Sequence, residues 1–178
     1  MDSLTPTSAC AGLLPLSVGR MTVTEMDCGP ITSVTPFKAA SIAALERALG
    51  MPFPAPLQTT SDGAARCVWV GQGEALLIGV APDAGLAALA AVVDQSDAWA
   101  VVQLDGPHGA EVMSRLSPVD LRQHVFGIGD TLRTQLGHMN ASITRLDDDR
   151  LMIAVFRSMA GTLVHDLARA LEAVAARG

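Results

Sequence analysis

The chain has 178 residues, a length that fits one domain or two closely packed halves sharing a core. Hydrophobic residues make up 49% of it and charged residues only 17%, which excludes a disordered polymer. The net charge is −6 and the basic residues are scattered singly, so nucleic acid is not expected as a partner. The apolar stretches are far shorter than the roughly 20 residues of a membrane span, so no membrane contact is expected.

Cysteine usage and the N-terminal segment predict a reducing compartment. Cys10, Cys28 and Cys67 are odd in number and lack metal-type spacing, which favours unpaired thiols over a disulfide framework. The N-terminus has neither the basic segment nor the long apolar stretch of a secretory signal. We therefore expect a cytoplasmic protein. Residues 1–19 are rich in Ser, Thr, Ala and Pro and are predicted to form a flexible tail, followed by one domain over 20–178.

In the first half, the hydrophobic pattern predicts a strand, a helix, a hairpin and a second helix. These elements are expected at 21–27 (strand), 38–49 (helix), 66–70 and 75–80 (hairpin strands) and 84–94 (helix). Gly50 follows the first helix in the position of a C-cap glycine. Asp83 precedes the second helix in the position of an N-cap.

The second half repeats this order. Its elements are expected at 99–104 (strand), 106–116 (helix), 133–146 and 151–156 (strands joined by a polar turn) and 160–177 (helix). Both halves, about 20–96 and 97–178, therefore have the order β-α-β-β-α. This duplicated order predicts an α+β fold with two antiparallel-rich sheets and helices packed on them.

The sequence contains no complete catalytic, cofactor-binding or metal-binding motif. None of the histidine pairs has the i,i+4 spacing of metal ligands on a helix. His138 is expected in the middle of a strand, where a structural role is favoured over a catalytic one. The acidic triplet 147–149 lacks the alternating ligands of a cation loop and is expected to be a hairpin turn. We therefore predict no catalytic, cofactor-binding or metal residues.

The segment from Phe156 to Thr162 is the best candidate for contact with a ligand or partner. Arg157 ends an apolar strand, and Ser158 or Thr162 is expected to cap the following helix, so that a carboxylate would be favoured there. That carboxylate belongs either to a ligand or neighbouring subunit or to an Asp of the same chain. The predicted interface or anion contact comprises Arg133, His138, Arg157, Ser158 and Thr162.

Five stretches in a fixed order resemble one known family. They are Trp69–Ile78, Leu104–Pro107, Leu116–Arg122, Arg133–Met139 and Phe156–Leu167. Together they resemble the gamma subunit of heterotetrameric sarcosine oxidase, and the resemblance runs from about Arg66 to Leu167. Ala75 departs from the pattern, because the family tends to carry an aromatic residue before the Leu pair.

The resemblance implies a fold similar to the folate-binding domain of glycine-cleavage aminomethyltransferases. Such complexes oxidatively demethylate sarcosine to glycine and pass the one-carbon unit to tetrahydrofolate. The resemblance further implies that the flavins (FAD and FMN) lie on the beta subunit, NAD and folate on the alpha subunit, and zinc on the delta subunit. It also implies that the gamma subunit carries no cofactor. We therefore expect a non-catalytic accessory subunit whose partners are the alpha, beta and delta subunits and whose buried apolar surface holds the flavin and folate subunits in register.

Two alternatives stay open. In the first, the chain is a stand-alone folate-binding or aminomethyltransferase-like protein, in which Arg157 would contact the glutamate tail of folate. In the second, it is a binding module for another dehydrogenase. The three hypotheses differ in what binds the chain, so isolation of its partners distinguishes them.

Overall fold

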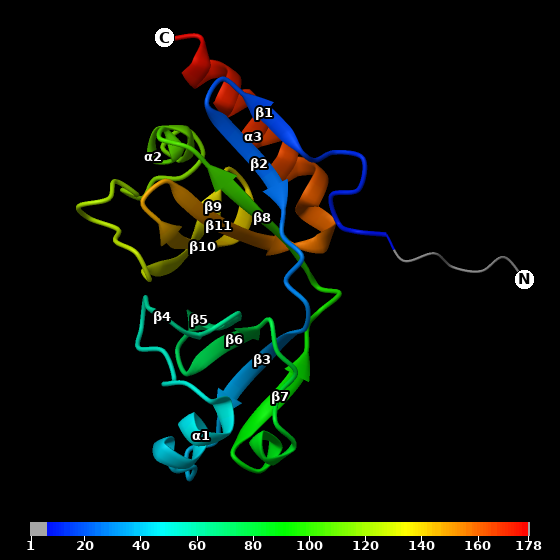
Figure 1. Ribbon diagram of the computed structural model, residues 1–178, viewed down its shortest axis with the longest axis vertical. Helices are drawn as coiled ribbons and strands as arrows, with labels where there is room; N and C mark the ends of the chain where they lie inside the picture. The colour runs from blue at the N-terminus through cyan, green and yellow to red at the C-terminus, as the bar shows by residue number, and fades with distance from the viewer. Residues whose placement is uncertain (1–6, 178) are drawn as a thin grey trace, which may run out of the picture.

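The computed structural model describes residues 7–177, which form two antiparallel sheets packed face to face (Figure 1). Sheet A has six strands in the order β1-β2-β8-β11-β10-β9. Their bounds are Leu16–Val18 (β1), Met21–Glu25 (β2), Trp99–Asp105 (β8), Arg150–Phe156 (β11), Met139–Asp147 (β10) and Thr131–Leu136 (β9). Sheet B has five strands in the order β4-β5-β6-β3-β7. They span Thr59–Asp62 (β4), Ala65–Gly71 (β5), Glu74–Ile78 (β6), Ile31–Pro36 (β3) and Ala90–Asp94 (β7).

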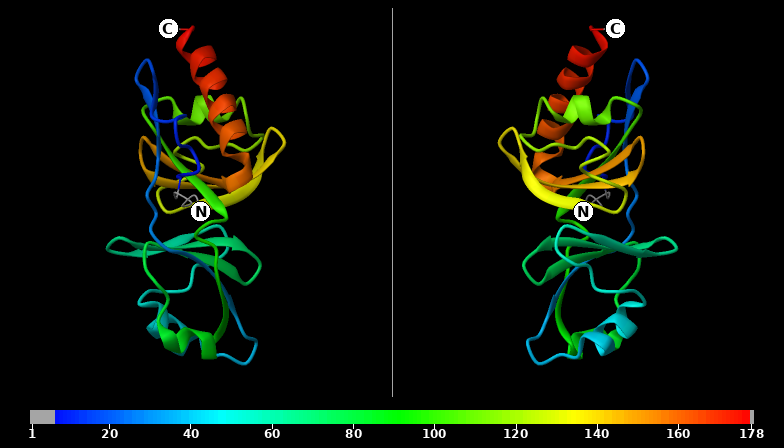
Figure 2. Two further views of the ribbon diagram at one scale, coloured as in Figure 1. Left: turned by 90° about the vertical axis from the view of Figure 1, so that its right-hand side faces the viewer. Right: turned by 90° about the vertical axis from the view of Figure 1, so that its left-hand side faces the viewer.

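Helices cover the outer face of each sheet, so the molecule has four layers (Figure 2). Sheet A carries α2 (Gly109–Met113) and α3 (Ala160–Ala175), and sheet B carries α1 (Ile42–Leu49) and the 3-10 helix η1 (Ala84–Ala88). The predicted α+β class with antiparallel sheets is confirmed. Within residues 7–177, none of the helices has the length and apolar character that a membrane crossing requires.

The alternation of side chains along the strands divides the apolar residues among three cores. In β8, Val102 and Leu104 belong to the core between sheet A and its helices, whereas Val101 lies in the core between the two sheets. The core between the sheets consists of Ile31, Val68, Val70, Leu76, Ile78, Val101, Met152 and Ala154. Because both sheets are buried on both faces, most of their strands must be apolar on both sides.

The two halves have matching strand positions, although their residues do not repeat. The order β4-β5-β6-β3-β7 of sheet B corresponds to β9-β10-β11-β8-β2 of sheet A. The bulged hairpin between β5 and β6 corresponds to the bulged hairpin between β10 and β11. Equivalent positions also meet across the sandwich: Thr59 donates its N–H to the Gly129 carbonyl (2.8 Å), and Thr131 donates to the Leu57 carbonyl (3.0 Å). This reciprocal pair of hydrogen bonds indicates an internal pseudo-two-fold relation.

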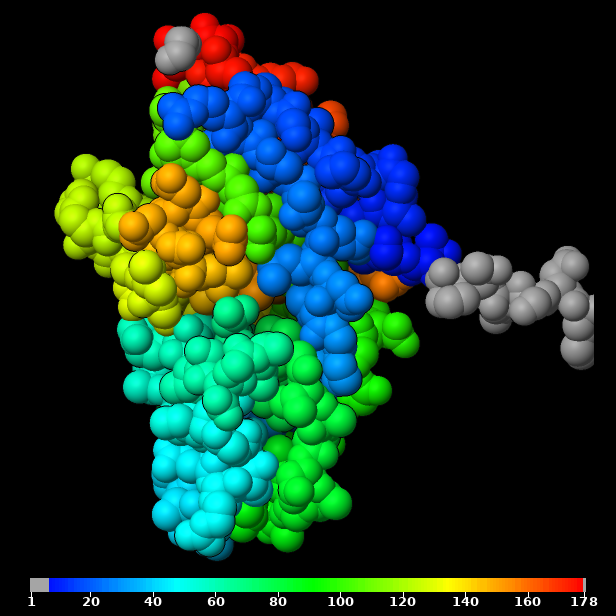
Figure 3. All heavy atoms as spheres, viewed as in Figure 1, coloured from blue at the N-terminus to red at the C-terminus, as the bar shows by residue number. Residues whose placement is uncertain are grey.

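The structure differs from the predicted division of the chain at residue 96. Strand β2, expected in the first half, pairs with β8 and completes sheet A, so sheet B is nested within the sequence of sheet A. In Figure 3 the chain in mid-blue begins with β2 in the upper part of the molecule and continues beyond it toward the lower part. The predicted loose tail 1–19 is wrong from residue 7 onward, because Cys10 is buried and β1 pairs with β2. Residues 1–6 of that tail lie outside the described residues.

Two elements were assigned wrongly from the sequence. The predicted helix 84–94 ends after η1, and Ala90–Asp94 forms β7, because pairing with β3 outweighs the helical pattern of the alanines. The predicted strand 133–146 is a hairpin of β9 and β10 with its turn at Gly137–His138. In addition, β3 and β4 were not predicted.

Several local predictions are confirmed. Gly50 caps α1 in the left-handed conformation, with φ +74°. Asp83 caps η1 and accepts a hydrogen bond from the Gly85 N–H at 2.7 Å. The predicted helix 106–116 is shorter in the structure, because α2 spans only Gly109–Met113 and its N-cap is His108. Gly106 lies before this helix with φ +126°, and a Cβ there would lie 2.5 Å from the Arg20 carbonyl oxygen. That position therefore requires glycine.

Arg145 in β10 organises the irregular segment 114–130 that connects α2 to β9. Its side chain is buried, and its guanidinium donates to the carbonyl oxygens of Phe126 (2.6 Å), Leu121 (2.5 Å) and Asp148 (2.7 Å). Burial lowers the pKa of Arg145 from its usual value, and the nearby carboxylates of Asp148, Asp149 and Asp130 act in the opposite direction. The charge is therefore stabilised mainly by carbonyl dipoles rather than by an ion pair.

We predict that Arg145→Met lowers the free energy of unfolding by about 3 kcal/mol, since two buried carbonyl oxygens, those of Leu121 and Phe126, and the part-buried one of Asp148 lose their donors. Urea unfolding measures this change. The matched control is Arg150→Met on the same hairpin, because Arg150 forms an exposed ion pair with Asp105 at 2.8 Å. That substitution is expected to cost less than about 1 kcal/mol. Equal effects of the two substitutions would contradict the role of Arg145.

Candidate functional site

Arg157 lies where sheet A, α3 and the N-terminal segment meet. It begins a short 3-10 helix, η2 (Arg157–Met159), between β11 and α3. Its backbone N–H donates to the Ala98 carbonyl at 2.7 Å, and its guanidinium donates to the Thr7 carbonyl. The side chain is exposed and, among the described residues, forms no ion pair. The internal pairing of Arg157 with an Asp, which the sequence left open, is therefore absent from residues 7–177.

The predicted cap of α3 is wrong. The N-cap residue is Met159, which makes no side-chain capping hydrogen bond. Ser158 lies in η2, and Thr162 is the third residue of α3, and both side chains are exposed. The 3-10 turn inserted between strand and helix moves the helix start beyond Ser158. Both residues remain close in sequence to Arg157, on the same exposed end of α3.

The other two predicted site residues lie elsewhere on sheet A. Arg133 is in the edge strand β9 and donates from Nη1 to the Val70 carbonyl of sheet B at 3.2 Å. It therefore has a structural contact between the two sheets. His138 is exposed in the β9–β10 turn rather than in mid-strand. Since Ala141 lies opposite Val155, this turn is at the same end of sheet A as Arg157. The five residues do not form one cluster.

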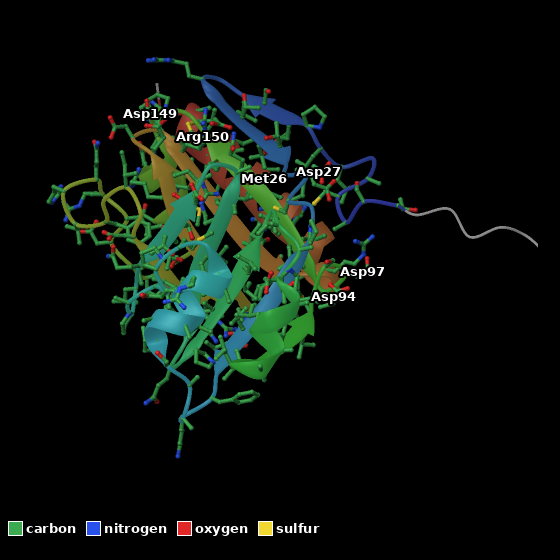
Figure 4. The ribbon with its side chains drawn as sticks, turned by 60° about the horizontal axis from the view of Figure 1, so that its bottom comes forward. Met26, Asp27, Asp94, Asp97, Asp149 and Arg150 are labelled. Carbon is green, nitrogen blue, oxygen red and sulfur yellow. The ribbon has the colours of Figure 1, made fainter. Side chains whose placement is uncertain are left out.

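A cleft of about 400 Å³ lies beside Arg157. Its walls come from the two segments that pass between the sheets, residues 26–30 and 95–98, and from the start of the described chain. Figure 4 labels Met26 and Asp27 on the first of these segments. Glu25 in the wall accepts hydrogen bonds from Ser8 Oγ (2.6 Å) and the Cys10 N–H (3.0 Å). Several of these wall residues lie in predicted strands, but their convergence on one cleft depends on the connections between the sheets, which no periodic pattern predicts.

Trp99 contributes an aromatic ring to the wall of this cleft. Its ring lies 5.1 Å from that of Phe156, measured between centroids. Its buried indole N–H has no hydrogen-bond partner among the described residues. Phe156 is 45% exposed and Met159 40% exposed, although both are large and apolar. An exposed aromatic and aliphatic patch beside an Arg is the combination that dominates binding energy in protein interfaces. We call Trp99, Phe156, Arg157 and Met159 the Arg157 patch.

The site offers little for metal or nucleophilic chemistry. Residues 7–177 contain no group of three or more His, Cys, Asp or Glu side chains that could hold a metal ion. Burial raises the pKa of the Cys28 thiol, in the cleft wall, to about 11, with a smaller contribution from Asp27. Burial likewise raises the pKa of Cys10 to about 11 and that of Cys67 to about 12. At neutral pH these thiols are protonated and therefore poor nucleophiles.

The comparisons with known proteins show which solved structure has a similar fold. Neither a family model nor a curated protein matches the sequence. Among solved structures, the chain is similar to a chain of heterotetrameric sarcosine oxidase from Corynebacterium sp. U-96, solved in complex with pyrrole 2-carboxylate. The TM-score is 0.82 over 96% of this chain and 96% of that chain, at 23% sequence identity. The likeness concerns the fold, and it extends over the part before Arg66 where the sequence resemblance was faint.

We predict that stability falls at alkaline pH through Cys67. The unfolded thiol ionises near pH 9 and the folded one only near 12, so between these values unfolding releases a proton and becomes easier as the pH rises. From pH 8 to pH 10 this contributes a loss of about 1.4 kcal/mol. Urea unfolding under reducing conditions measures it. The same loss in Cys67→Ala would contradict the assignment, since that variant lacks the titrating group.

We also predict that Arg157→Ala changes the free energy of unfolding of the isolated chain by less than about 1 kcal/mol. The reason is that the guanidinium is exposed and its bond to the Thr7 carbonyl can be replaced by water. Thermal unfolding followed by circular dichroism checks this. A loss of several kcal/mol would mean that Arg157 is a structural residue and would remove it from the candidate site.

Proposed function

We propose that the chain is a non-catalytic accessory subunit, of the gamma type, in a cytoplasmic heterotetrameric sarcosine oxidase. In this proposal the alpha, beta and delta subunits carry FAD, FMN, NAD, folate and zinc. They perform the oxidative demethylation of sarcosine to glycine and the transfer of the one-carbon unit to tetrahydrofolate. This chain contributes buried surface that fixes the positions of those subunits.

The observation that carries the proposal is the end-to-end fold likeness to a chain of heterotetrameric sarcosine oxidase, over 96% of both chains. The five sequence stretches that resemble the gamma subunit support the same role. They include the segment that carries Arg157 and the segment that carries Arg133.

The surface of the molecule supports a role in assembly. The Arg157 patch exposes apolar rings and a cation together, which suits a partner with an apolar surface and a carboxylate. Arg157 is held in place through the Thr7 carbonyl, so little side-chain entropy would be lost on binding. Because its own chain provides no ion pair within the described residues, the charge is available to a partner.

Reconstitution tests the proposal. The chain is co-expressed with the alpha, beta and delta subunits of a heterotetrameric sarcosine oxidase, and the product is examined by size-exclusion chromatography and flavin absorbance. We expect one copy of the chain in a yellow complex that oxidises sarcosine, whereas the chain alone is colourless and inactive in an oxygen-uptake assay. Flavin or stoichiometric zinc on the isolated chain would contradict the proposal. Saturable tetrahydrofolate binding to the isolated chain would support the stand-alone alternative instead.

Arg157→Ala is expected to weaken this assembly by about 2–5 kcal/mol, because a partner carboxylate in a desolvated interface would lose its counter-charge. Affinity is measured by titrating the variant against the other three subunits. Arg169→Ala is the matched control, since Arg169 is also exposed and lies further along α3. Unchanged affinity of Arg157→Ala would remove Arg157 from the interface without affecting the rest of the proposal.

A further inference from the structure

The sandwich has four outer strands, and three of their edges are protected. The β4 and β9 edges are joined at their starts by the reciprocal hydrogen bonds of Thr59 and Thr131, and β9 carries the charged Arg133. The β1 edge is three residues long and lies between Pro15 and Gly19. Proteins protect sheet edges in these ways because an open edge pairs with other chains.

The edge of β7 lacks such protection. Its sequence, Ala-Ala-Val-Val-Asp, has no Pro or Lys, and its pairing with β3 contains no bulge. No strand in residues 7–177 pairs with its outer side. Ala90 is buried, but Ala91 and Asp94 are exposed and Val93 is 51% exposed. The open part of the edge therefore runs from Ala91 to Asp94.

The hydrogen bonds that flank β7 show which backbone groups point outward. The Phe37 N–H donates to the Leu89 carbonyl (3.0 Å), and the Gln95 N–H donates to the Ile31 carbonyl (2.8 Å). In an antiparallel pair of strands, every second residue forms backbone hydrogen bonds to the neighbouring strand, and the residues between them turn their N–H and C=O groups to the other side. Residues 89, 91, 93 and 95 therefore bond to β3, whereas the N–H and C=O groups of Val92 and Asp94 face away from the sheet.

The pseudo-two-fold relation shows what an occupied edge looks like. Val23 pairs with Leu104 in sheet A as Val92 pairs with Val34 in sheet B, so β2 is the equivalent of β7, and Glu25 is the equivalent of Asp94. In sheet A the outer edge of β2 is covered. Leu16 of β1 pairs with Val23, and Ser8 and Cys10 donate to the Glu25 carboxylate. The equivalent edge in sheet B is the outer edge of β7, and no strand of residues 7–177 pairs with it.

The acidic residues near β7 indicate that a strand bound at its open edge belongs to a different protein and not to a second copy of this chain. Residues 83–97 contain Asp83, Asp94 and Asp97 and no Lys or Arg. Asp94 and Asp97 lie near each other at the margin of the molecule (Figure 4). A second copy would bring the same acidic segment and the same net charge of −6. The Asp94 Oδ1 atom accepts hydrogen bonds from the Ser96 N–H (2.9 Å) and from Ser96 Oγ (2.6 Å). A strand with a donor or a basic side chain would meet the other carboxylate oxygen, as Ser8 and Cys10 each meet one oxygen of Glu25.

We propose that the outer edge of β7 from Ala91 to Asp94 binds an extended segment of a partner subunit as an additional antiparallel strand. The segment places an apolar residue opposite Val92 and a basic or other donor group at Asp94. It repeats at sheet B what residues 8–18 do at sheet A. This inference rests on the proposed role of the chain as a subunit, and it names the surface through which one partner is held.

Hydrogen–deuterium exchange tests the inference on the isolated chain and on the reconstituted complex, with single-residue resolution by electron-transfer fragmentation. The Val92 and Asp94 amides are expected to exchange rapidly in the isolated chain and at least about tenfold more slowly in the complex. The Ala91 and Val93 amides are the internal control, because their bonds to β3 protect them in both states.

The outcomes separate this inference from the proposed function. If the complex assembles and the Val92 and Asp94 amides remain rapid, the edge is not used and only the inference is overturned. If those amides become slow in the isolated chain as it dimerises, the occupant is a second copy and the inference is overturned. If no complex forms, the proposed function fails and the inference fails with it.

Two pairs of variants provide a second measurement. Val92→Pro removes an outward N–H without removing a bond to β3, and Val92→Ala removes the same side chain but keeps the N–H. We expect Val92→Pro to bind the partner subunits roughly tenfold more weakly than Val92→Ala. If Val92→Pro does not fold, Asp94→Asn is compared with Asp97→Asn, which lies beyond the strand. Weakening by Asp94→Asn alone supports the inference, and equal effects contradict it.

Discussion

The structure depends on the burial of two sheets against each other. Each sheet already has helices on its outer face, so the inner faces are covered only because they meet. The contact consists of a small set of aliphatic side chains, among them Val70, Leu76 and Met152. Removing large aliphatic side chains from such a contact typically costs about 2–5 kcal/mol each. In a chain with 49% hydrophobic residues and no tyrosine, this requirement is met largely by aliphatic side chains.

The same packing places the candidate surfaces at the margins of the sandwich. One margin is closed by hydrogen bonds between residues 57–59 and 129–131. At the other, the segments 26–30 and 95–98 cross between the sheets, and the Arg157 cleft and the end of β7 lie beside these crossings. In the proposed function, this scaffold would offer partner subunits two different surfaces, one built from side chains at the Arg157 patch and one from backbone groups at β7.

The sequence predicted the parts of the fold that local patterns determine. Turn residues located the β5–β6 and β10–β11 hairpins, and Gly50 and Asp83 located helix ends. It missed β7 because an alanine-rich run suits either a helix or a strand, and only β3 decides between them. For the site, the strands that carry Trp99 and Glu25 and the strand end at Arg157 were predicted, but the sequence did not show that these residues meet at one cleft. They come together because residues 26–30 and 95–98 connect the two sheets, and no periodic pattern predicts the course of such connections.

The nesting of sheet B within sheet A has a consequence for the order of folding during synthesis. All strands of sheet B lie between Ile31 and Asp94, so that sheet can form as soon as this part of the chain leaves the ribosome. The hairpin of β1 and β2 is made first but has no neighbour until Trp99–Asp105 emerges, since Val23 pairs with Leu104. Residues 16–25 are therefore synthesised before sheet B but can take their place in sheet A only after it.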